Sequence, residues 1–399
     1  MPDKSQPVAI KYPRGSYIIL EGKPSADRFY IIKKGWVQIT RETDSIMPEE
    51  KVAGPGEMFG VVSAMASRSY IETAVTMSNV LLLMFDRSYI SKSPPVAVNI
   101  IRQFSQRLRK LDEAFSLRAL KSSAENDPSH LIHVGSYYEK TGKASQALYA
   151  YERYLACFPN TDNTENVKRK ILKMKARVKV SRPEYSSDTM VQTYPKGCLL
   201  FAEGEKGNSL YIIQEGSVKI TRIADNQEIV LAVLKKGDIF GEMAMLENKG
   251  RAATAEIYED ATLLSVNRAN FSILLNEQPD LVVRLTTLMA ERIWLLYRQL
   301  TNTLIDNSLG RLYDTLLTQL EKNRLDLNSV SSYECNFGFR ELMGMAGIPE
   351  EKTNEMYKRV FTARRIIEKN DKVVVQNIAS ISKEADYFRR SQKILSHKQ

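Results

Sequence analysis

The sequence contains two copies of one segment, separated by 181–182 residues. Tyr12–Gly15 recurs as Tyr194–Gly197 and, after the loss of one residue, Tyr30–Gly35 recurs as Tyr211–Gly216. A near-constant offset over about 65 positions indicates a duplicated domain rather than chance similarity. Further matches are Val37–Arg41 with Val218–Arg222, Phe59-Gly60 with Phe240-Gly241, and Thr73-Ala74 with Thr254-Ala255. We therefore expect two domains of one fold, the first copy and the second copy.

Each copy has the pattern of short strands followed by a long helix. In the second copy, Leu210–Ile213 and Val218–Thr221 flank a Glu-Gly turn, and Ile229–Leu234 runs into Lys-Gly-Asp. Short β-rich runs with turns between them are typical of a sandwich or jelly roll. Apolar residues at three- and four-residue spacing then predict helices over Val96–Phe115 and Pro279–Leu304.

A helical insert separates the two copies. Its pattern resembles one tetratricopeptide helix pair, carried by Leu131, Val134, Gly135, Tyr138, Gly142, Ala147, Tyr151 and Pro159. One such repeat cannot bury its apolar face alone, so we expect it to pack on another part of the chain. A further helix is expected over Asn166–Val180, and the insert offers a surface for protein partners.

Composition narrows the class of protein. Three widely spaced cysteines, no apolar signal segment and a longest dense apolar run of six residues, Val80–Phe85, predict a cytoplasmic protein without a membrane span. The three histidines, His130, His133 and His397, are too scattered for a catalytic triad, so we expect no catalytic residues and no metal. We therefore predict a protein that is not an enzyme and holds no cofactor.

The second copy carries a motif that suits a bound phosphate. Phe240-Gly241-Glu242-Met243-Ala244 is followed, after a short loop, by Arg251-Ala252-Ala253-Thr254. The guanidinium of Arg251 can form bidentate, charge-assisted bonds to an anion. Gly241 lets the backbone approach a ligand closely, and a short helix from about Glu242 to Leu246 would point its amides at a phosphate.

This order of residues resembles the cyclic-nucleotide-binding domain family of catabolite-activator-type regulators. The resemblance implies that Arg251 binds the cyclic phosphate, that Glu242 accepts a ribose hydroxyl, and that the small residues after Arg251 lie against the sugar-phosphate. The alternative is that Glu242 and Arg251 only pair with each other on a surface loop. In the first copy Val61 and Tyr70 replace the two charged residues, which predicts a degenerate site that binds no cyclic phosphate unless Arg68 substitutes for the missing arginine.

The base of the nucleotide is less well determined by the sequence. Ala252 directly follows the arginine, which in the resembled family favours cyclic AMP over cyclic GMP, and a cyclic dinucleotide stays open. Alignment of the long helix with the resembled family places Leu296 and Tyr297 where activator-type members contact the base, so Tyr297 could stack on the base or hydrogen-bond to it. The alternative is that Tyr297 belongs to the core or to the seam of a homodimer built on this helix.

Residues 306–399 resemble the winged helix-turn-helix of activator-type regulators. Gly310–Leu317 matches its opening helix, Arg340–Pro349 the helix and turn, Glu350–Phe361 the recognition helix and Ile366–Val375 the wing. Candidate DNA contacts are Lys352, Asn354, Lys358 and Arg359. The sequence departs from the resembled family by having acids in the first turns of the expected recognition helix. These are Glu350, Glu351 and Glu355, and acids at such positions oppose binding to DNA phosphates.

The distribution of charge bears on the same question. Residues 102–182 hold 17 Lys and Arg against 8 Asp and Glu, whereas residues 301–399 hold 16 against 13. The basic surplus of this chain, which has net charge +10, therefore lies in the middle and not at the expected reading head.

These observations predict an α+β, multidomain chain with four parts. Two jelly-roll (cupin-like) domains with flanking helices occupy residues 1–120 and 184–305, the helical insert residues 121–183, and the winged-helix-like module residues 306–399. The function that follows is a cyclic-nucleotide-responsive transcription regulator, with ligand in the second copy. The alternative is a signalling adaptor that binds a cyclic nucleotide or dinucleotide, does not bind DNA, and contacts proteins through its insert and C-terminal module.

Overall fold

The computed structural model divides the chain into two compact units. The first comprises Met1–Thr40 and Glu50–Ile293, and the second Arg41–Glu49 and Trp294–Gln399. The structure describes residues 6–48, 52–119, 129–176, 190–224, 227–247, 249–277, 279–362 and 364–396. The predicted domain boundaries near residues 120 and 183 lie outside these ranges. No helix within them is long and apolar enough to cross a membrane.

The first copy is an antiparallel sandwich of two sheets. One sheet has the strand order β1-β8-β3-β6 and the other β2-β7-β4-β5. Apolar side chains such as Ile32, Val37, Ala74 and Leu82 fill the space between them. The strands are β1 (Val8–Tyr12), β2 (Tyr17–Ile19), β3 (Arg28–Lys34), β4 (Val37–Thr40), β5 (Val52–Ala53), β6 (Met58–Phe59), β7 (Thr73–Thr76) and β8 (Val80–Asp86).

Short helices complete the first copy before a long one. They are α1 (Val61–Ala66) and the 3-10 turn η2 (Arg87–Lys92), and the chain then enters α2 (Pro94–Ala119). The predicted helix over Val96–Phe115 is confirmed, with ends slightly beyond those expected. Its buried residues include Ile100, Ile101, Leu108 and Leu111.

The second copy repeats this arrangement with longer strands. Its sheet has the order β10-β14-β11-β12, with β13 paired to β11 and β9 to β14. Together the two copies confirm the predicted pair of β-sandwich domains. The elements are β9 (Val191–Tyr194), β10 (Leu199–Phe201), β11 (Ser209–Ala224), β12 (Gln227–Lys235), β13 (Ile239–Phe240), β14 (Thr254–Asn267), α6 (Glu242–Glu247), α7 (Arg268–Glu277) and α8 (Pro279–Asn302).

A glycine allows β11 to run past the β14 backbone. Gly216 has φ +78°, and a Cβ there would lie 2.7 Å from Ala261 Cα. Only glycine tolerates both the positive φ and this close approach. Its counterpart in the first copy, Gly35, has φ +91°, so the duplicated glycine reflects a duplicated backbone requirement.

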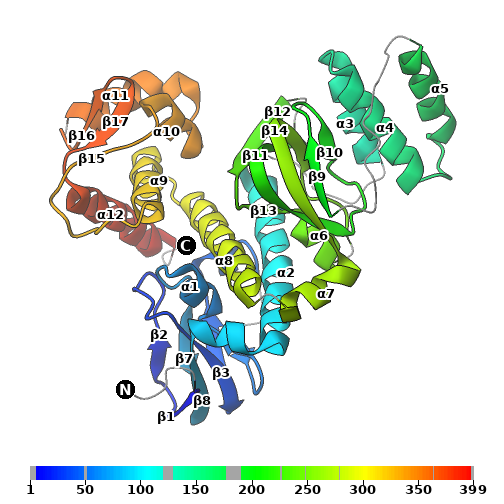
Figure 1. Ribbon diagram of the computed structural model, residues 1–399. Helices are drawn as coiled ribbons and strands as arrows, with labels where there is room; N and C mark the ends of the chain where they lie inside the picture. Colours follow the sequence, from blue (N-terminus) through cyan, green and yellow to red (C-terminus); the bar gives the residue numbers. More distant parts are fainter. Residues whose placement is uncertain are drawn as a thin grey trace. The chain divides into compact units, whose positions relative to one another are not determined.

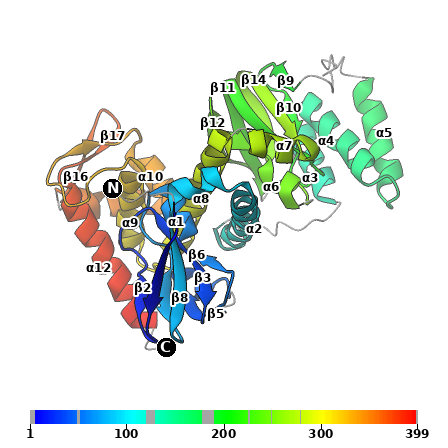
Figure 2. The same ribbon diagram turned by 60° about the horizontal axis from the view of Figure 1, so that its bottom comes forward.

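Within its described residues, 129–176, the insert contains three helices, and it packs on the second copy. These are α3 (Ser129–Lys140), α4 (Ala144–Cys157) and α5 (Thr164–Lys175), so the helix expected over Asn166–Val180 begins earlier, and residues 177–180 lie outside the described ranges. The apolar faces of α3 and α4 form one cluster with Leu199, Ala202 and Ile223 of the second copy, and both views show the helices beside it (Figures 1 and 2). Assignment to a tetratricopeptide pair stays a prediction.

The second unit contains the C-terminal module and the end of α8. Its sheet, β15-β17-β16, lies beside α10 and α11 (Figure 1). The hairpin turns at Asn370 and Asp371, with φ +52° and +55°, as a tight hairpin turn requires. The elements are η1 (Glu42–Ser45), α9 (Ser308–Lys322), β15 (Tyr333–Glu334), α10 (Phe339–Met345), η3 (Glu350–Lys352), α11 (Thr353–Thr362), β16 (Ile366–Lys369), β17 (Lys372–Val375) and α12 (Ile378–Ser396).

The core of this module is apolar around a buried ion group. Asp314 is fully buried on α9, lies 3.6 Å from Arg298 Nη2, accepts from Asn302 Nδ2 at 2.9 Å and also pairs with Arg389. The order of helices and the hairpin agree with the segments expected from the sequence. Whether the module is a winged helix-turn-helix that reads DNA stays a prediction.

Candidate ligand-binding site

Arg251 lies buried at the entry to β14, where the expected phosphate site begins. Its Nη1 donates to the backbone oxygens of Ser209 at 2.8 Å and Gly241 at 2.7 Å. The guanidinium carbon lies 4.0 Å from the centre of the Phe201 ring. The residue is 6% exposed, and its buried Nε has no hydrogen-bond partner in the protein. The Arg251 guanidinium therefore bonds to neutral carbonyl groups through Nη1, while its Nε–H has no acceptor in the protein.

A second buried arginine shows how this fold treats a structural cation. Arg222 is 1% exposed and lies 2.8 Å from Asp112 Oδ2 and 3.0 Å from Glu203 Oε1. Burial alone would lower the pKa of Arg222, but the two carboxylates outweigh it and the pKa rises. The pKa of Arg251 is lowered, because burial outweighs the more distant charges around it. Two carboxylates therefore balance the charge of Arg222, whereas Arg251 bonds to uncharged carbonyl oxygens.

Two glycines make room for the Arg251 side chain. Gly241 has φ +78°, and a Cβ there would lie 2.5 Å from Nη1 of Arg251. A Cβ on Gly207 would collide with Nε of the same side chain. The sequence predicted that Gly241 permits a close backbone approach, and the approaching group in this structure is the guanidinium itself.

Glu242 is buried but turns to a different partner. It is 1% exposed, and its Oε1 lies 2.6 Å from Nη1 of Arg292 on α8. The alternative of an isolated Glu242–Arg251 surface pair is therefore wrong. Arg292 lies 50 residues beyond Glu242, and no charge pattern in the sequence links the two residues.

The remaining cassette residues are buried or half-buried. Phe240, Met243, Ala244 and Thr254 are buried, and Ala252 and Ala253 are half-buried. The Phe240 ring lies 5.4 Å from Tyr211 and 5.9 Å from Phe201. The hydroxyl of Thr254 accepts the backbone N–H of Glu203 at 3.0 Å. Aromatic packing and this bond fix the strand that presents Arg251.

A cavity of about 520 Å³ opens beside Arg251. Its walls come from the β9–β10 hairpin, the loop 205–208 and helix α4 of the insert. Ten residues were predicted to bind the ligand. Of these, Arg251 is among the residues that line this cavity and the other nine are not. The volume lies within the range of small-molecule sites, so Arg251 lines a space that can hold a ligand.

Comparison with known proteins identifies the family. Residues 9–92 and 191–278 each match the cyclic nucleotide-binding domain family. A CRP-like cAMP-activated global transcriptional regulator of Mycobacterium tuberculosis is 30% identical over 163 residues, which are 41% of this chain and 73% of that protein. This chain belongs to the CRP-like cyclic nucleotide-binding family.

Other relatives match shorter or more distant stretches. The cyclic AMP receptor protein of Thermus thermophilus is 36% identical over 101 residues, 25% of this chain, so the chain spans about half (47%) of that relative. The crystal structure of the Thermus thermophilus catabolite activator protein is 25% identical, covers 50% of this chain and 90% of its own, and has a TM-score of 0.29.

The first cyclic nucleotide-binding copy holds a buried carboxylate beside Gly60, the glycine that matches Gly241. Glu72, 4% exposed, accepts the backbone N–H of Gly60 at 2.7 Å and lies 3.6 Å from Arg107 on α2. Gly60 has φ +74°, close to the φ of its counterpart Gly241. Tyr70 is buried beside it, and the backbone N–H of Arg68 donates to Ser63. The first copy thus places a carboxylate of the chain itself next to this glycine.

Helix α2 of the first copy holds the cassette loop of the second. Nε of Arg109 lies 2.7 Å from Glu247, whose other oxygen accepts the Ser105 hydroxyl at 2.7 Å. Nη2 of Arg109 donates to the backbone of Gly250 at 3.2 Å. Asp112, one turn farther along α2, pairs with Arg222, which also bonds the backbone oxygen of Ala252. The two cyclic nucleotide-binding copies therefore share one polar network.

The predicted base and DNA contacts lie in the second unit. Tyr297 is 2% exposed, and its hydroxyl accepts the backbone N–H of Glu42 at 3.1 Å. Lys352, Asn354, Lys358 and Arg359 are exposed, and Arg359 lies 3.4 Å from Glu355 one turn away. Among the described residues, no group of three or more His, Cys, Asp or Glu side chains is arranged to hold a metal.

Proposed function

We propose that the second copy binds a cyclic nucleotide and holds its phosphate at Arg251. The observation that carries this proposal is the buried guanidinium with a free Nε beside a cavity. Burying a cation without a counter-ion is costly. The protein offers Arg251 two carbonyl oxygens, while the comparably buried Arg222 has two carboxylates. An anionic ligand would supply the missing charge.

A cyclic phosphate matches this demand in charge and geometry. It carries one negative charge and several acceptor oxygens, and hydrogen bonds to charged groups contribute about 1.5–3 kcal/mol each. We favour cyclic AMP over cyclic GMP, since Ala252 offers no hydroxyl after the arginine and the relatives above are named for cyclic AMP. Glu242 is the acceptor proposed for the ribose.

The proposed output runs through α8. Arg292 on this helix pairs with Glu242, and α8 continues without a break from the first unit into the second. A ligand that binds Glu242 would therefore bias the position of α8, a coupling that in regulatory proteins is typically about 1–3 kcal/mol. We propose that a cytoplasmic homodimer uses this coupling to regulate transcription through Lys352, Asn354, Lys358 and Arg359.

Calorimetry with cyclic AMP, cyclic GMP and cyclic dinucleotides tests the proposal. We expect cyclic AMP to bind the wild type and Arg169→Ala alike, because Arg169 is exposed on α5. Arg251→Ala should weaken binding at least a hundredfold, as expected for the loss of about 3 kcal/mol. Equal affinity of wild type and Arg251→Ala would refute the proposed site.

An adaptor that does not bind DNA is the second candidate. It is favoured by the acid beside the candidate DNA residues: Glu355 pairs with Arg359 on α11, and the Tyr357 ring nearby is 41% exposed. Exposed aromatic side chains are common in protein interfaces. Gel shifts with a genomic fragment library, with and without cyclic AMP, distinguish the candidates, because an adaptor shifts no fragment in either state.

A further inference from the structure

The cavity beside Arg251 has one wall that comes from outside the cyclic nucleotide-binding domain. Ser145, Gln146, Tyr149 and Arg153 of α4 face the β9–β10 hairpin and the loop 205–208 across it. Domains of this family are matched here by residues 191–278, whereas α4 belongs to the insert. The insert therefore contributes to the space into which Arg251 opens.

A buried carboxylate joins this wall to the second copy. Glu205, 4% exposed, accepts the Tyr149 hydroxyl at 3.0 Å and lies 2.6 Å from Nη2 of Arg153. The same carboxylate accepts the backbone N–H of Ala202 at 3.0 Å. Burial holds the pKa of Tyr149 well above its usual value, with Glu205 adding to the effect. The hydroxyl therefore stays protonated and donates, so α4 is fixed against the cavity.

The lining of the cavity is strongly cationic. Arg153, Lys196, Lys206 and Arg251 line it, and among the described lining residues Glu205 is the acid that opposes them. Arg153 and Arg251 each have a buried Nε without a hydrogen-bond partner in the protein. Two guanidinium groups that line one cavity favour an anion with acceptors in more than one direction. Aromatic rings of Tyr149 and Tyr211 lie in the same lining and suit a planar base.

We propose that helix α4 of the insert forms part of the ligand site, so that the cyclic nucleotide held by Arg251 also contacts Tyr149 and Arg153. This inference rests on the proposed function and specifies where the rest of the ligand lies. The ligand class is a cyclised phosphodiester that carries a base, either a cyclic mononucleotide or a cyclic dinucleotide. The insert then senses the ligand directly, without a relay through α8.

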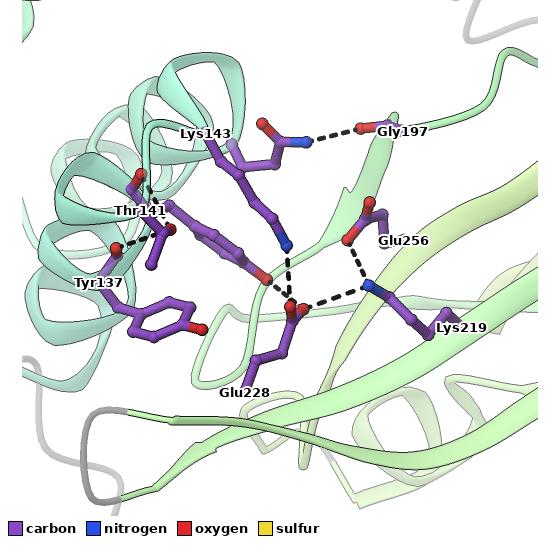
Figure 3. Close-up of polar contacts among 9 residues, drawn as sticks. Tyr137, Thr141, Lys143, Gly197, Lys219, Glu228 and Glu256 are labelled. Carbon is purple, nitrogen blue, oxygen red and sulfur yellow. Dashed lines mark hydrogen bonds and ion pairs between the residues drawn. The ribbon is translucent and has the colours of Figure 1, made fainter.

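A second polar network keeps α4 in place for this role. Figure 3 shows Lys143, at the start of α4, beside Glu228, Lys219 and Glu256 of the second copy. The Lys143–Glu228 distance is 2.8 Å, the Lys219–Glu228 distance 3.4 Å and the Lys219–Glu256 distance 3.2 Å. Gln146 also donates to the backbone oxygen of Gly197 at 3.2 Å. A wall that is held before the ligand arrives loses little conformational freedom on binding.

A cysteine in the lining allows a direct test on the intact protein. Cys198 lines the cavity and is half-buried, and Cys157, at the end of α4, is half-buried but is not among the lining residues. Burial raises the pKa of Cys335 to about 11, so this thiol should react slowly and serve as a baseline. The rate of iodoacetamide labelling of each cysteine is measured by mass spectrometry with no ligand, with cyclic AMP, with cyclic GMP and with cyclic dinucleotides.

We expect the ligand that binds in calorimetry to slow labelling of Cys198 at least tenfold and to leave Cys157 unchanged. Arg153→Ala and Ser145→Trp should each weaken binding at least tenfold, whereas the matched control Arg169→Ala should not. Ser145→Trp fills the cavity without removing a contact to Glu205, which covers the case in which Arg153→Ala misfolds.

The two proposals fail in different ways in this experiment. If a nucleotide binds and needs Arg251, but Cys198 labels at an unchanged rate and Ser145→Trp binds normally, the role of α4 is overturned and the proposed function stands. If no cyclic nucleotide binds the wild type, the proposed function fails, and the role of α4 fails with it.

Discussion

Glu72 in the first copy accepts the backbone N–H of Gly60 at 2.7 Å, whereas in the second copy the carbonyl of the matching Gly241 accepts Nη1 of Arg251 at 2.7 Å. The backbone N–H of Gly60 thus bonds a carboxylate and the carbonyl of Gly241 bonds a guanidinium, although the two glycines have a similar positive φ. The first copy already contains an anion at its cassette, and the second contains a cation. This difference explains why duplication of the fold need not duplicate the site.

The first prediction concerns this built-in carboxylate. Glu72→Gln should lower the free energy of unfolding by about 1–3 kcal/mol, because the buried amide of Gly60 loses a charged acceptor and the ion pair with Arg107 is lost. Urea unfolding measures the change. Glu57→Gln, on a less buried residue of the same copy, is the control. Equal stability of Glu72→Gln and wild type would show that the carboxylate is dispensable.

The second prediction tests the link between Glu242, the proposed ribose acceptor, and α8. Glu242→Gln and Arg292→Ala should each weaken cyclic AMP binding about tenfold, or about 1.4 kcal/mol. The double variant should be little worse than either single one, because Arg292 acts by orienting Glu242 at 2.6 Å. Arg284→Ala on the same helix is the control. Additive losses in the double variant would contradict an orienting role.

The third prediction concerns pH and the attachment of the insert. Burial alone would raise the pKa of Glu228, but hydrogen bonds and charges from Lys143 and Lys219 outweigh it, so the pKa is lowered. A carboxyl group whose pKa is lower in the folded than in the unfolded state stabilises the folded state at pH values above the unfolded pKa of about 4.3. This contribution is lost as the pH falls below that value. Proteolysis of the insert should therefore accelerate below about pH 4.3.

Glu228→Gln provides the comparison for this pH effect. This substitution removes the titrating group and keeps a side chain of similar size. Proteolysis of the insert in Glu228→Gln should therefore be faster than in the wild type at pH 7, and acid should accelerate it less. An identical acid response of wild type and Glu228→Gln would assign the effect to other groups.

The fourth prediction uses two helical glycines. Gly135→Ala should destabilise the insert by about 1–3 kcal/mol through overpacking, because a Cβ there would lie 2.6 Å from the Tyr151 ring. Gly344→Ala on α10 meets no atom within 4 Å and should stabilise its helix by up to about 1 kcal/mol. Thermal unfolding of the two variants checks the opposite signs.

Much of the fold followed from the internal repeat and from local patterns. The spacing of short strands predicted both sandwiches, and the glycines at 35 and 216 recur because the same backbone crossing recurs. The short helix after Gly241 was expected from about Glu242 to Leu246 and spans Glu242–Glu247. Local sequence determines these features, because turns, caps and strand periodicity depend on neighbouring residues.

The site was only partly predictable, because its contacts join distant parts of the chain. The cassette singled out Arg251 and a close approach at Gly241, but the approach was expected from a ligand and is made by the guanidinium of Arg251. Nothing in the pattern of α4 shows which side of that helix faces the second copy, so Tyr149 and Arg153 were missed. Glu72 follows Tyr70 by two residues and lies outside the matched pairs of the repeat, so its role as an internal anion was also missed.

The most direct measurement is the stoichiometry of cyclic AMP on the full chain, determined by equilibrium dialysis with labelled ligand on wild type and Arg251→Ala. The account predicts one bound nucleotide per chain in the wild type and none at the same concentration in Arg251→Ala. Two equivalent nucleotides per chain, or one that persists in Arg251→Ala, would contradict it.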